Sequence, residues 1–298
     1  MMGRTEHLRA MARLVLRGLR ERGGEEAQPR APRRRTAVER EGPAPAPPRV
    51  RAYARATDGE RISAFRGEDA ILPPTLCATW ETALVLELLC SLDTPLPLGG
   101  VLHLESERVP LRPLRPADRV RCRVELERAE TIPRGVRLTV CARNWNGSGQ
   151  LCTEGSAVFL VRSRDPSVGK SRADEGASAG EGWAEVARWR LGSGAGRRYA
   201  LASGDFNPIH LWGLTARPFG FRRPILHGFC TEGMVAHALV ERLLGGDPTA
   251  LRRLHVVFRA PLLLPAEARL LVGEREGRRA FRVVSGERVC AEGEFVGG

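Results

Sequence analysis

The sequence almost lacks lysine, because Lys170 is its only one and arginine supplies the rest of the 47 basic residues. With 35 acidic residues the net charge is +12, and residues 1–50 contribute half of it through twelve arginines and six acidic residues. A net positive charge of this size can indicate a protein that binds nucleic acid or an anionic ligand. The arginine bias runs through the whole chain, as base composition alone would produce, so we predict no nucleic-acid partner.

Long apolar runs are also missing. No stretch reaches the roughly 20 residues that span a bilayer, which predicts no stable membrane insertion. The N-terminus does not have the pattern of a signal peptide. This predicts a cytoplasmic location, or a mitochondrial or peroxisomal one in a eukaryote.

Pairs of cysteines at metal-ligand or redox spacing are absent as well. The seven cysteines occur singly within apolar segments and read as buried thiols in a reducing compartment. No His, Cys or Asp spacing offers a metal site. Gly169-Lys170-Ser171 resembles the end of a phosphate-binding loop, but Arg164 stands where its first glycine is required. We therefore expect no metal and no cofactor.

Residues 1–50 differ in composition from the rest of the chain. Residues 1–24 have an amphipathic, basic helical pattern. This segment could have one of three roles: a surface helix packed on the domain, a mitochondrial transit peptide or a membrane-surface helix. Residues 25–50 are rich in Pro, Arg and Glu with few large apolar side chains, which is typical of a solvated linker.

The segment 51–162 has the pattern of one folded domain. A helical run with a broad apolar face, which includes Trp80, Leu84 and Leu88, follows Thr75 as its expected cap. Strand-like runs follow over Val101–Val109, Arg119–Arg128, Val136–Trp145 and Leu151–Arg162. One long helix followed by an antiparallel meander is predicted.

The segment 183–298 repeats this pattern after a polar, glycine-rich linker over residues 163–182. Leu102-His103 matches Leu254-His255, and Arg108-Val109-Pro110-Leu111 matches Arg259-Ala260-Pro261-Leu262, at offsets of 152 and 151 residues. Strands are expected over Arg269–Glu276, Arg279–Ser285 and Val289–Val296. A repeat of this length predicts two copies of one domain rather than a solenoid.

The stretch from Tyr199 to Gly228 concentrates the candidate chemistry. Asp205 and His210 are five residues apart, which an uninterrupted helix would place about 140° apart. Pro208 and the turn residues around it instead favour a folded-back loop on which an acid and an imidazole converge on one small molecule, such as water. Gly228 opens an apolar helix, where backbone N–H groups lack acceptors and can stabilise developing negative charge.

This stretch resembles the MaoC-like family of (R)-specific enoyl-thioester hydratases and 3-hydroxyacyl-thioester dehydratases. The resemblance covers about 45 residues and rests on Tyr199, Ser203-Gly204-Asp205, Asn207-Pro208-Ile209-His210, Ala216, Gly220-Phe221, Pro224-Ile225 and His227-Gly228. It implies an α+β fold, the double hotdog, with two copies of a long central helix wrapped by a curved antiparallel sheet. Only the second copy carries the acid–histidine loop. This arrangement resembles the family members that have a lone active half, and the resemblance implies that the inactive half makes room for a long acyl chain.

The resemblance also implies an activity: the reversible hydration of trans-2-enoyl thioesters to (3R)-3-hydroxyacyl thioesters in fatty-acid metabolism. Asp205 and His210 are expected as the catalytic pair, with the Gly228 N–H polarising the thioester carbonyl. On the substrate-binding side we expect Ser203, Asn207 and His227 to shape and support the loop.

An anionic carrier is the expected partner. Arg259, with Arg222 and Arg223, can meet the phosphates of coenzyme A or of an acyl carrier protein's phosphopantetheine. The partners implied are therefore an acyl-CoA or acyl-carrier-protein thioester, and a second copy in a homodimer of double-hotdog chains.

Two other functions fit the same fold. A hotdog thioesterase would hydrolyse acyl thioesters, and a non-catalytic subunit would only bind them. The intact pattern of Ser203-Gly204-Asp205, Asn207-Pro208 and His210 favours the hydratase over both.

Overall fold

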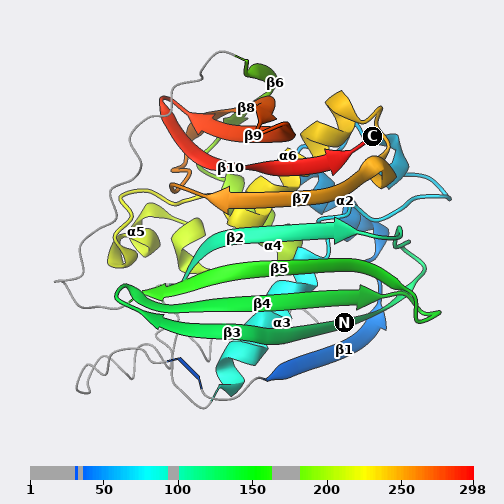
Figure 1. Cartoon of the computed structure of the whole chain (residues 1–298), viewed down its shortest axis with the longest axis horizontal. Coiled ribbons are helices and arrows are strands. Elements are labelled where there is room, and N and C mark those ends of the chain that lie inside the picture. Colours follow the sequence, from blue (N-terminus) through cyan, green and yellow to red (C-terminus); the bar gives the residue numbers. More distant parts are fainter. Residues whose placement is uncertain (1–30, 33–35, 93–100, 163–181) are drawn as a thin grey trace.

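The computed structural model describes residues 31–32, 36–92, 101–162 and 182–298. A single antiparallel sheet of ten strands spans the molecule, with the helices on one of its faces (Figure 1). Within the described ranges, none of the helices is long and apolar enough to cross a membrane. The predicted basic helix of residues 1–24 lies outside these ranges, as do residues 163–181 of the predicted linker.

The order of the strands repeats as a mirror image about the middle of the sheet: β1-β3-β4-β5-β2 followed by β7-β10-β9-β8-β6. The first half consists of β1 (Ala37–Pro43), β2 (Val101–Pro110), β3 (Arg119–Ile132), β4 (Gly135–Trp145) and β5 (Leu151–Arg162). The second consists of β6 (Ala184–Leu191), β7 (Leu251–Phe258), β8 (Ala266–Arg275), β9 (Arg278–Ser285) and β10 (Arg288–Gly297). Two copies of one domain, as the repeat predicts, account for this symmetry.

The two halves join where β2 pairs with β7, here called the seam. Its register sets Ser106 opposite Val256 and Arg108 opposite Leu254. The predicted strands at 101–109, 119–128, 136–145, 151–162, 269–276, 279–285 and 289–296 are confirmed to within a few residues. Alternating burial along β3 and β4 gives these strands the periodicity by which they were predicted.

Each half has one long apolar helix against the sheet, α3 (Ala78–Ser91) in the first and α6 (Gly228–Leu243) in the second. Nearly every residue of α6 from Phe229 to Val240 is buried. The α3 helix begins at Ala78, three residues after its expected cap, Thr75. The Thr75 hydroxyl accepts a hydrogen bond from Tyr53 at 2.9 Å. The shorter helices are α2 (Pro47–Ala56), η2 (Ser63–Phe65), α4 (Ala195–Ser203), η4 (Pro208–His210), α5 (Gly213–Ala216), η5 (Arg217–Phe219) and η6 (Pro248–Ala250).

The prediction of a solvated linker over residues 25–50 is wrong for most of its second half. Residues Ala37–Pro43 form β1, which pairs with β3 at the edge of the sheet, and α2 begins at Pro47. An edge strand with mostly exposed side chains carries no apolar alternation, so its composition resembles that of a linker. A proline in the first turn of a helix removes no intrahelical hydrogen bond.

A buried ionic cluster crosses the seam beneath the two long helices. Arg108 on β2 donates from Nη1 to both carboxylate oxygens of Glu81 on α3, each at 2.8 Å, and from Nε to Glu232 on α6 at 3.5 Å. All three side chains are at most 5% exposed. Glu81 also accepts from Asn144, and Glu232 accepts from Ser106. These contacts tie the two halves together through charges.

Candidate active site

The loop that carries the candidate acid begins at the end of α4. Gly204 takes the left-handed conformation, with φ of 90°, and its N–H donates to the Ala200 carbonyl at 2.8 Å. The Ser203 hydroxyl donates to the Tyr199 carbonyl at 2.9 Å and accepts from the Asp205 N–H at 3.1 Å. The chain therefore leaves the helix through a fixed turn that ends on Asp205.

Asn207 and Pro208 then fold the loop back. The Asn207 N–H donates to Asp205 Oδ1 at 3.1 Å, and its side-chain oxygen accepts from the Ile209 N–H at 3.4 Å. Pro208 opens the short helix η4, which ends on His210. The loop has the folded-back shape predicted from the sequence. Ser203 and Asn207 shape it, and their contact with substrate stays a prediction.

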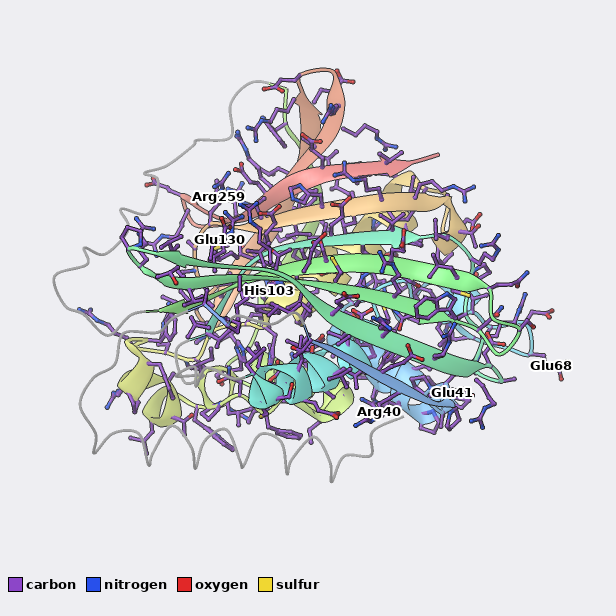
Figure 2. All side chains as sticks on the ribbon, turned by 60° about the horizontal axis from the view of Figure 1, so that its bottom comes forward. Arg40, Glu41, Glu68, His103, Glu130 and Arg259 are labelled. Carbon is purple, nitrogen blue, oxygen red and sulfur yellow. The ribbon has the colours of Figure 1, made fainter. Side chains whose placement is uncertain are left out.

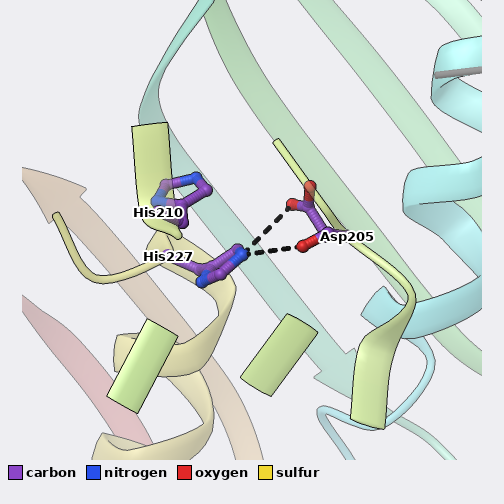
Figure 3. A group of neighbouring side chains, drawn as sticks. All are labelled: Asp205, His210 and His227. Atoms are coloured by element: carbon purple, nitrogen blue, oxygen red, sulfur yellow. Dashed lines mark hydrogen bonds and ion pairs between the residues drawn. The ribbon is translucent and has the colours of Figure 1, made fainter. Parts of the chain in front are cut away.

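Two stacked imidazoles face this acid (Figure 3). The His210 Nδ1 lies 2.9 Å from the Ile225 carbonyl, which can only accept, so Nδ1 carries the hydrogen and Nε2 keeps its lone pair. The His227 Nε2 donates in the same way to the Asp205 carbonyl at 3.0 Å. The two rings are 3.7 Å apart with an interplanar angle of 25°. His227 thereby holds both partners of the pair in place.

Burial keeps both imidazoles neutral. The pKa of His210 is lowered to about 3, chiefly by loss of solvent around the ring and also by the neighbouring His227, while Asp205 opposes the shift. Desolvation also lowers the pKa of His227 to about 3. A neutral His210 has its Nε2 lone pair available to accept a proton at neutral pH.

Asp205, His210 and His227 bring one donor atom each to within 4.8 Å of one another. Asp205 is the accessible member, with 18% of its side chain exposed, and its Oδ2 lies 4.0 Å from His227 Nε2. The hydrogen on His227 Nε2 faces a carbonyl, so this nitrogen offers no lone pair to an ion, and the set fits a metal poorly. The Asp205 carboxylate and the His210 imidazole instead form two neighbouring proton acceptors.

Gly228 begins α6 beside this group. The preceding His227 is extended, and its side chain makes no capping hydrogen bond, so the first turn offers N–H groups without intrahelical acceptors. A Cβ on Gly228 would lie 2.5 Å from His103 Nδ1 and 3.1 Å from Phe258 Cζ. Only glycine fits at this position, and the start of the helix lies next to a histidine of the other half.

His103 is a site residue that the sequence reasoning missed. It lies on β2, is half-buried, and is drawn near the middle of the view in Figure 2, whereas Glu68 lies at the edge. Its Nε2 donates to the Glu105 carbonyl at 3.1 Å, and its ring packs on Phe159, Phe229 and Phe258 at centroid distances of 4.4 to 5.1 Å. The match of Leu102-His103 with Leu254-His255 drew attention only to the repeat, and the catalytic loop alone gives no sign of a residue 100 positions earlier.

Arg259 is not brought into this group. Its guanidinium is exposed and pairs with Glu292, with Nη2 at 2.7 Å from the carboxylate. Arg222 and Arg223 are exposed on the segment that precedes Pro224. Their contact with substrate phosphates stays a prediction.

Four histidines with lowered pKa values predict a loss of stability in acid. Desolvation lowers the pKa of His103, His210 and His227 to about 3 and that of His237 to about 4, against about 6.5 in an unfolded chain. Below pH 6.5 the unfolded chain therefore binds more protons than the folded one. The free energy of unfolding should be level above about pH 7 and fall as the pH drops toward 3.

Urea unfolding at pH 7.5, 6 and 5 measures this slope above the usual range of carboxylates. A His237→Gln variant, changed outside the candidate site, should show a smaller loss between pH 7.5 and 5 than the parent. An unfolding free energy that is the same at all three pH values would contradict the account.

Comparison with known proteins finds relatives of this chain. Residues 187–292, which include the whole loop and α6, match the MaoC like domain. The 3-hydroxyacyl-thioester dehydratase X of Mycobacterium tuberculosis is 31% identical over 193 residues, which are 65% of this chain and 66% of that protein. The peroxisomal enoyl-CoA hydratase 2 of Arabidopsis thaliana is 46% identical over 79 residues, 26% of this chain and 25% of its own length.

Solved structures resemble nearly the whole chain. The crystal structure of HtdX from M. tuberculosis superposes with a TM-score of 0.70 and 26% identity, over 89% of this chain and all of that one. Another M. tuberculosis protein, described as a double hotdog fold, gives 0.59 at 14% identity over 88% of this chain and 95% of that one. The predicted double-hotdog fold is thereby confirmed.

Proposed function

The chain belongs to the MaoC-like family, and from this premise we propose that it hydrates trans-2-enoyl thioesters reversibly to (3R)-3-hydroxyacyl thioesters in fatty-acid metabolism. It is accordingly a hydro-lyase. The observation that carries the proposal is the Asp205 carboxylate and the neutral His210 imidazole, gathered beside the helix start at Gly228. Relatives named as hydratases and as dehydratases support both directions of the reaction.

The two acceptors can hold one water by its two hydrogens. In hydration the water oxygen bonds to Cβ while the π electrons of the double bond move toward Cα and the thioester carbonyl. The group that takes the water's proton returns it to Cα, so that OH and H are added and nothing else is consumed. Dehydration follows the same steps in reverse.

Negative charge that collects on the thioester oxygen needs a fixed donor. The backbone N–H groups at the start of α6, a helix of 16 residues, supply one together with the positive end of the helix dipole. Glycine at position 228 lets the carbonyl approach the backbone closely. We assign the Gly228 N–H to this role.

The substrate is a thioester, carried either by coenzyme A or by an acyl carrier protein. Arginines 222, 223 and 259 are the candidates to meet the phosphates, which both carriers share. We place the reaction in the cytoplasm, or in a mitochondrion or peroxisome of a eukaryote. Pairing of two chains into a homodimer stays a prediction.

The proposal is tested by incubating the purified protein with trans-2-enoyl-CoA esters of several chain lengths and with one enoyl-carrier-protein. Loss of the enoyl absorbance together with formation of the (3R) product supports it. Release of free thiol without loss of the double bond would identify a thioesterase, and binding without turnover would identify a non-catalytic subunit. Either result overturns the proposal.

Gly228→Ala is expected to lower kcat/KM for hydration by about 100-fold, since an added Cβ must displace His103 and shift the helix start, and a shift of about 1 Å can cost this much. Gly192→Ala is the matched control, because a Cβ there meets no atom within 4 Å. Steady-state kinetics of both variants measure the effect. Full activity of Gly228→Ala would remove the close approach from the mechanism.

A further inference from the structure

The N-terminal half reaches the catalytic loop through α2, whose first four residues the sequence analysis assigned to a linker. Arg49 lies in the first turn of α2 and donates from Nε to the Ala202 carbonyl at 3.0 Å and from Nη2 to the Ser203 carbonyl at 2.9 Å. These are carbonyls of the last turn of α4, two and three residues before Asp205. One guanidinium thus holds two consecutive peptide groups next to the candidate acid.

The Arg49 guanidinium gives the C-terminal end of α4 hydrogen-bond donors and a positive charge. The last carbonyls of a helix have no intrahelical donors, and cations are favourable at that end of the helix dipole. The last turn of α4 contains no basic residue of its own. Two hydrogen bonds from one planar guanidinium fix direction as well as distance, which a single ammonium group cannot do.

The surrounding contacts transmit this constraint to Asp205. Ser203 accepts the Asp205 N–H on its hydroxyl, and the Asp205 carbonyl accepts the hydrogen of His227 Nε2. The α2 and α4 helices also pack together through Tyr53 and Tyr199, whose ring centroids are 6.0 Å apart. A rigid helix of the first half therefore lies behind the residues that place the carboxylate and the histidines.

We propose that Arg49 is a positioning residue of the active site, which sets the location of the Asp205 carboxylate by clamping the end of α4. It acts through the loop, by its contacts with the Ala202 and Ser203 carbonyls. The expected effect of Arg49 on the rate rests on the proposed function, whereas its role in fixing the loop does not. If Arg49 has this role, β1 and α2, residues 37–56, are required for activity.

Arg49→Ala is expected to lower kcat for enoyl-thioester hydration by about 10- to 100-fold with KM changed by less than about threefold, because the pair is misplaced while the binding surface is kept. Arg49→Lys should recover only part of the loss. Arg51→Ala is the control on the same helix, since Arg51 is exposed, and it should keep the parental kcat. Parental kcat in Arg49→Ala, or an equal loss in Arg51→Ala, would overturn the proposal.

Hydrogen exchange gives a readout that does not require turnover. The amides of Asp205 and Asn207 donate within the loop, and both should exchange faster in Arg49→Ala than in the parent or in Arg51→Ala, while amides of β3 and β4 keep their protection. Unchanged exchange in the loop overturns the clamp. A parent protein that hydrates no enoyl thioester, with exchange changed as expected, rejects the proposed function and leaves the clamp standing.

Discussion

His210→Ala and Asp205→Asn are each expected to lower kcat for hydration by about 10²–10⁴-fold, the contribution of a positioned acid–base group. Alanine removes the Nε2 lone pair. Asparagine keeps the oxygen that accepts the Asn207 N–H, so the loop is preserved while the charged acceptor is lost. Single-turnover and steady-state kinetics on an enoyl-CoA measure the loss, and unfolding curves check that the fold is retained.

Matched controls change the same residue types elsewhere. Asp247→Asn alters an acid that caps η6, and His255→Ala alters a histidine that pairs with Glu105 across the seam. Both should keep most of the activity. A variant of Asp205 or His210 that retains more than about a tenth of the parental rate would exclude that residue from the proton transfers.

Arg108→Met is expected to destabilise the fold by about 3–5 kcal/mol, the range found when one partner of a buried ion pair is removed. Glu81 and Glu232 would then stay buried next to each other without the guanidinium between them. Burial already raises the pKa of Glu232, an effect that Arg108 opposes. Urea unfolding at pH 7 measures the change in free energy.

The repeat supplies the control for this variant. Arg259 occupies the position equivalent to Arg108 in the second half, but it is exposed and pairs with Glu292 at the surface. Arg259→Met should therefore change the free energy of unfolding by only about 0–1 kcal/mol. If the two substitutions changed the free energy of unfolding equally, burial of the charge cluster would not explain its contribution to stability.

The parts of the fold that the sequence could predict are those in which one chain segment carries its own pattern. Strand β3 alternates buried and exposed residues along Val120–Leu126, and α6 is apolar on nearly all sides. Strand β1 was missed because it pairs through its backbone while its side chains face water. Its partner lies about 80 residues away, so no local pattern could reveal the pairing.

The site divides in the same way. Asp205, His210 and Gly228 belong to one short stretch whose turn residues bring them together, and their proximity was predictable. His103 and Arg49 come from other parts of the chain and depend on the packing of the two halves, which periodicity does not specify. The pKa of His210 likewise follows from burial that only tertiary structure provides.

The seam also determines how the site responds to dilution. Asp205 and His210 come from one half, and His103 and Arg49 from the other, so the complete arrangement exists only while β2 and β7 are paired. If the halves were separate chains, their pairing would depend on protein concentration. At low concentration they would dissociate and the site would be incomplete. Because one chain carries both, each half meets the other at an effective concentration of about millimolar, whatever the concentration of the protein itself.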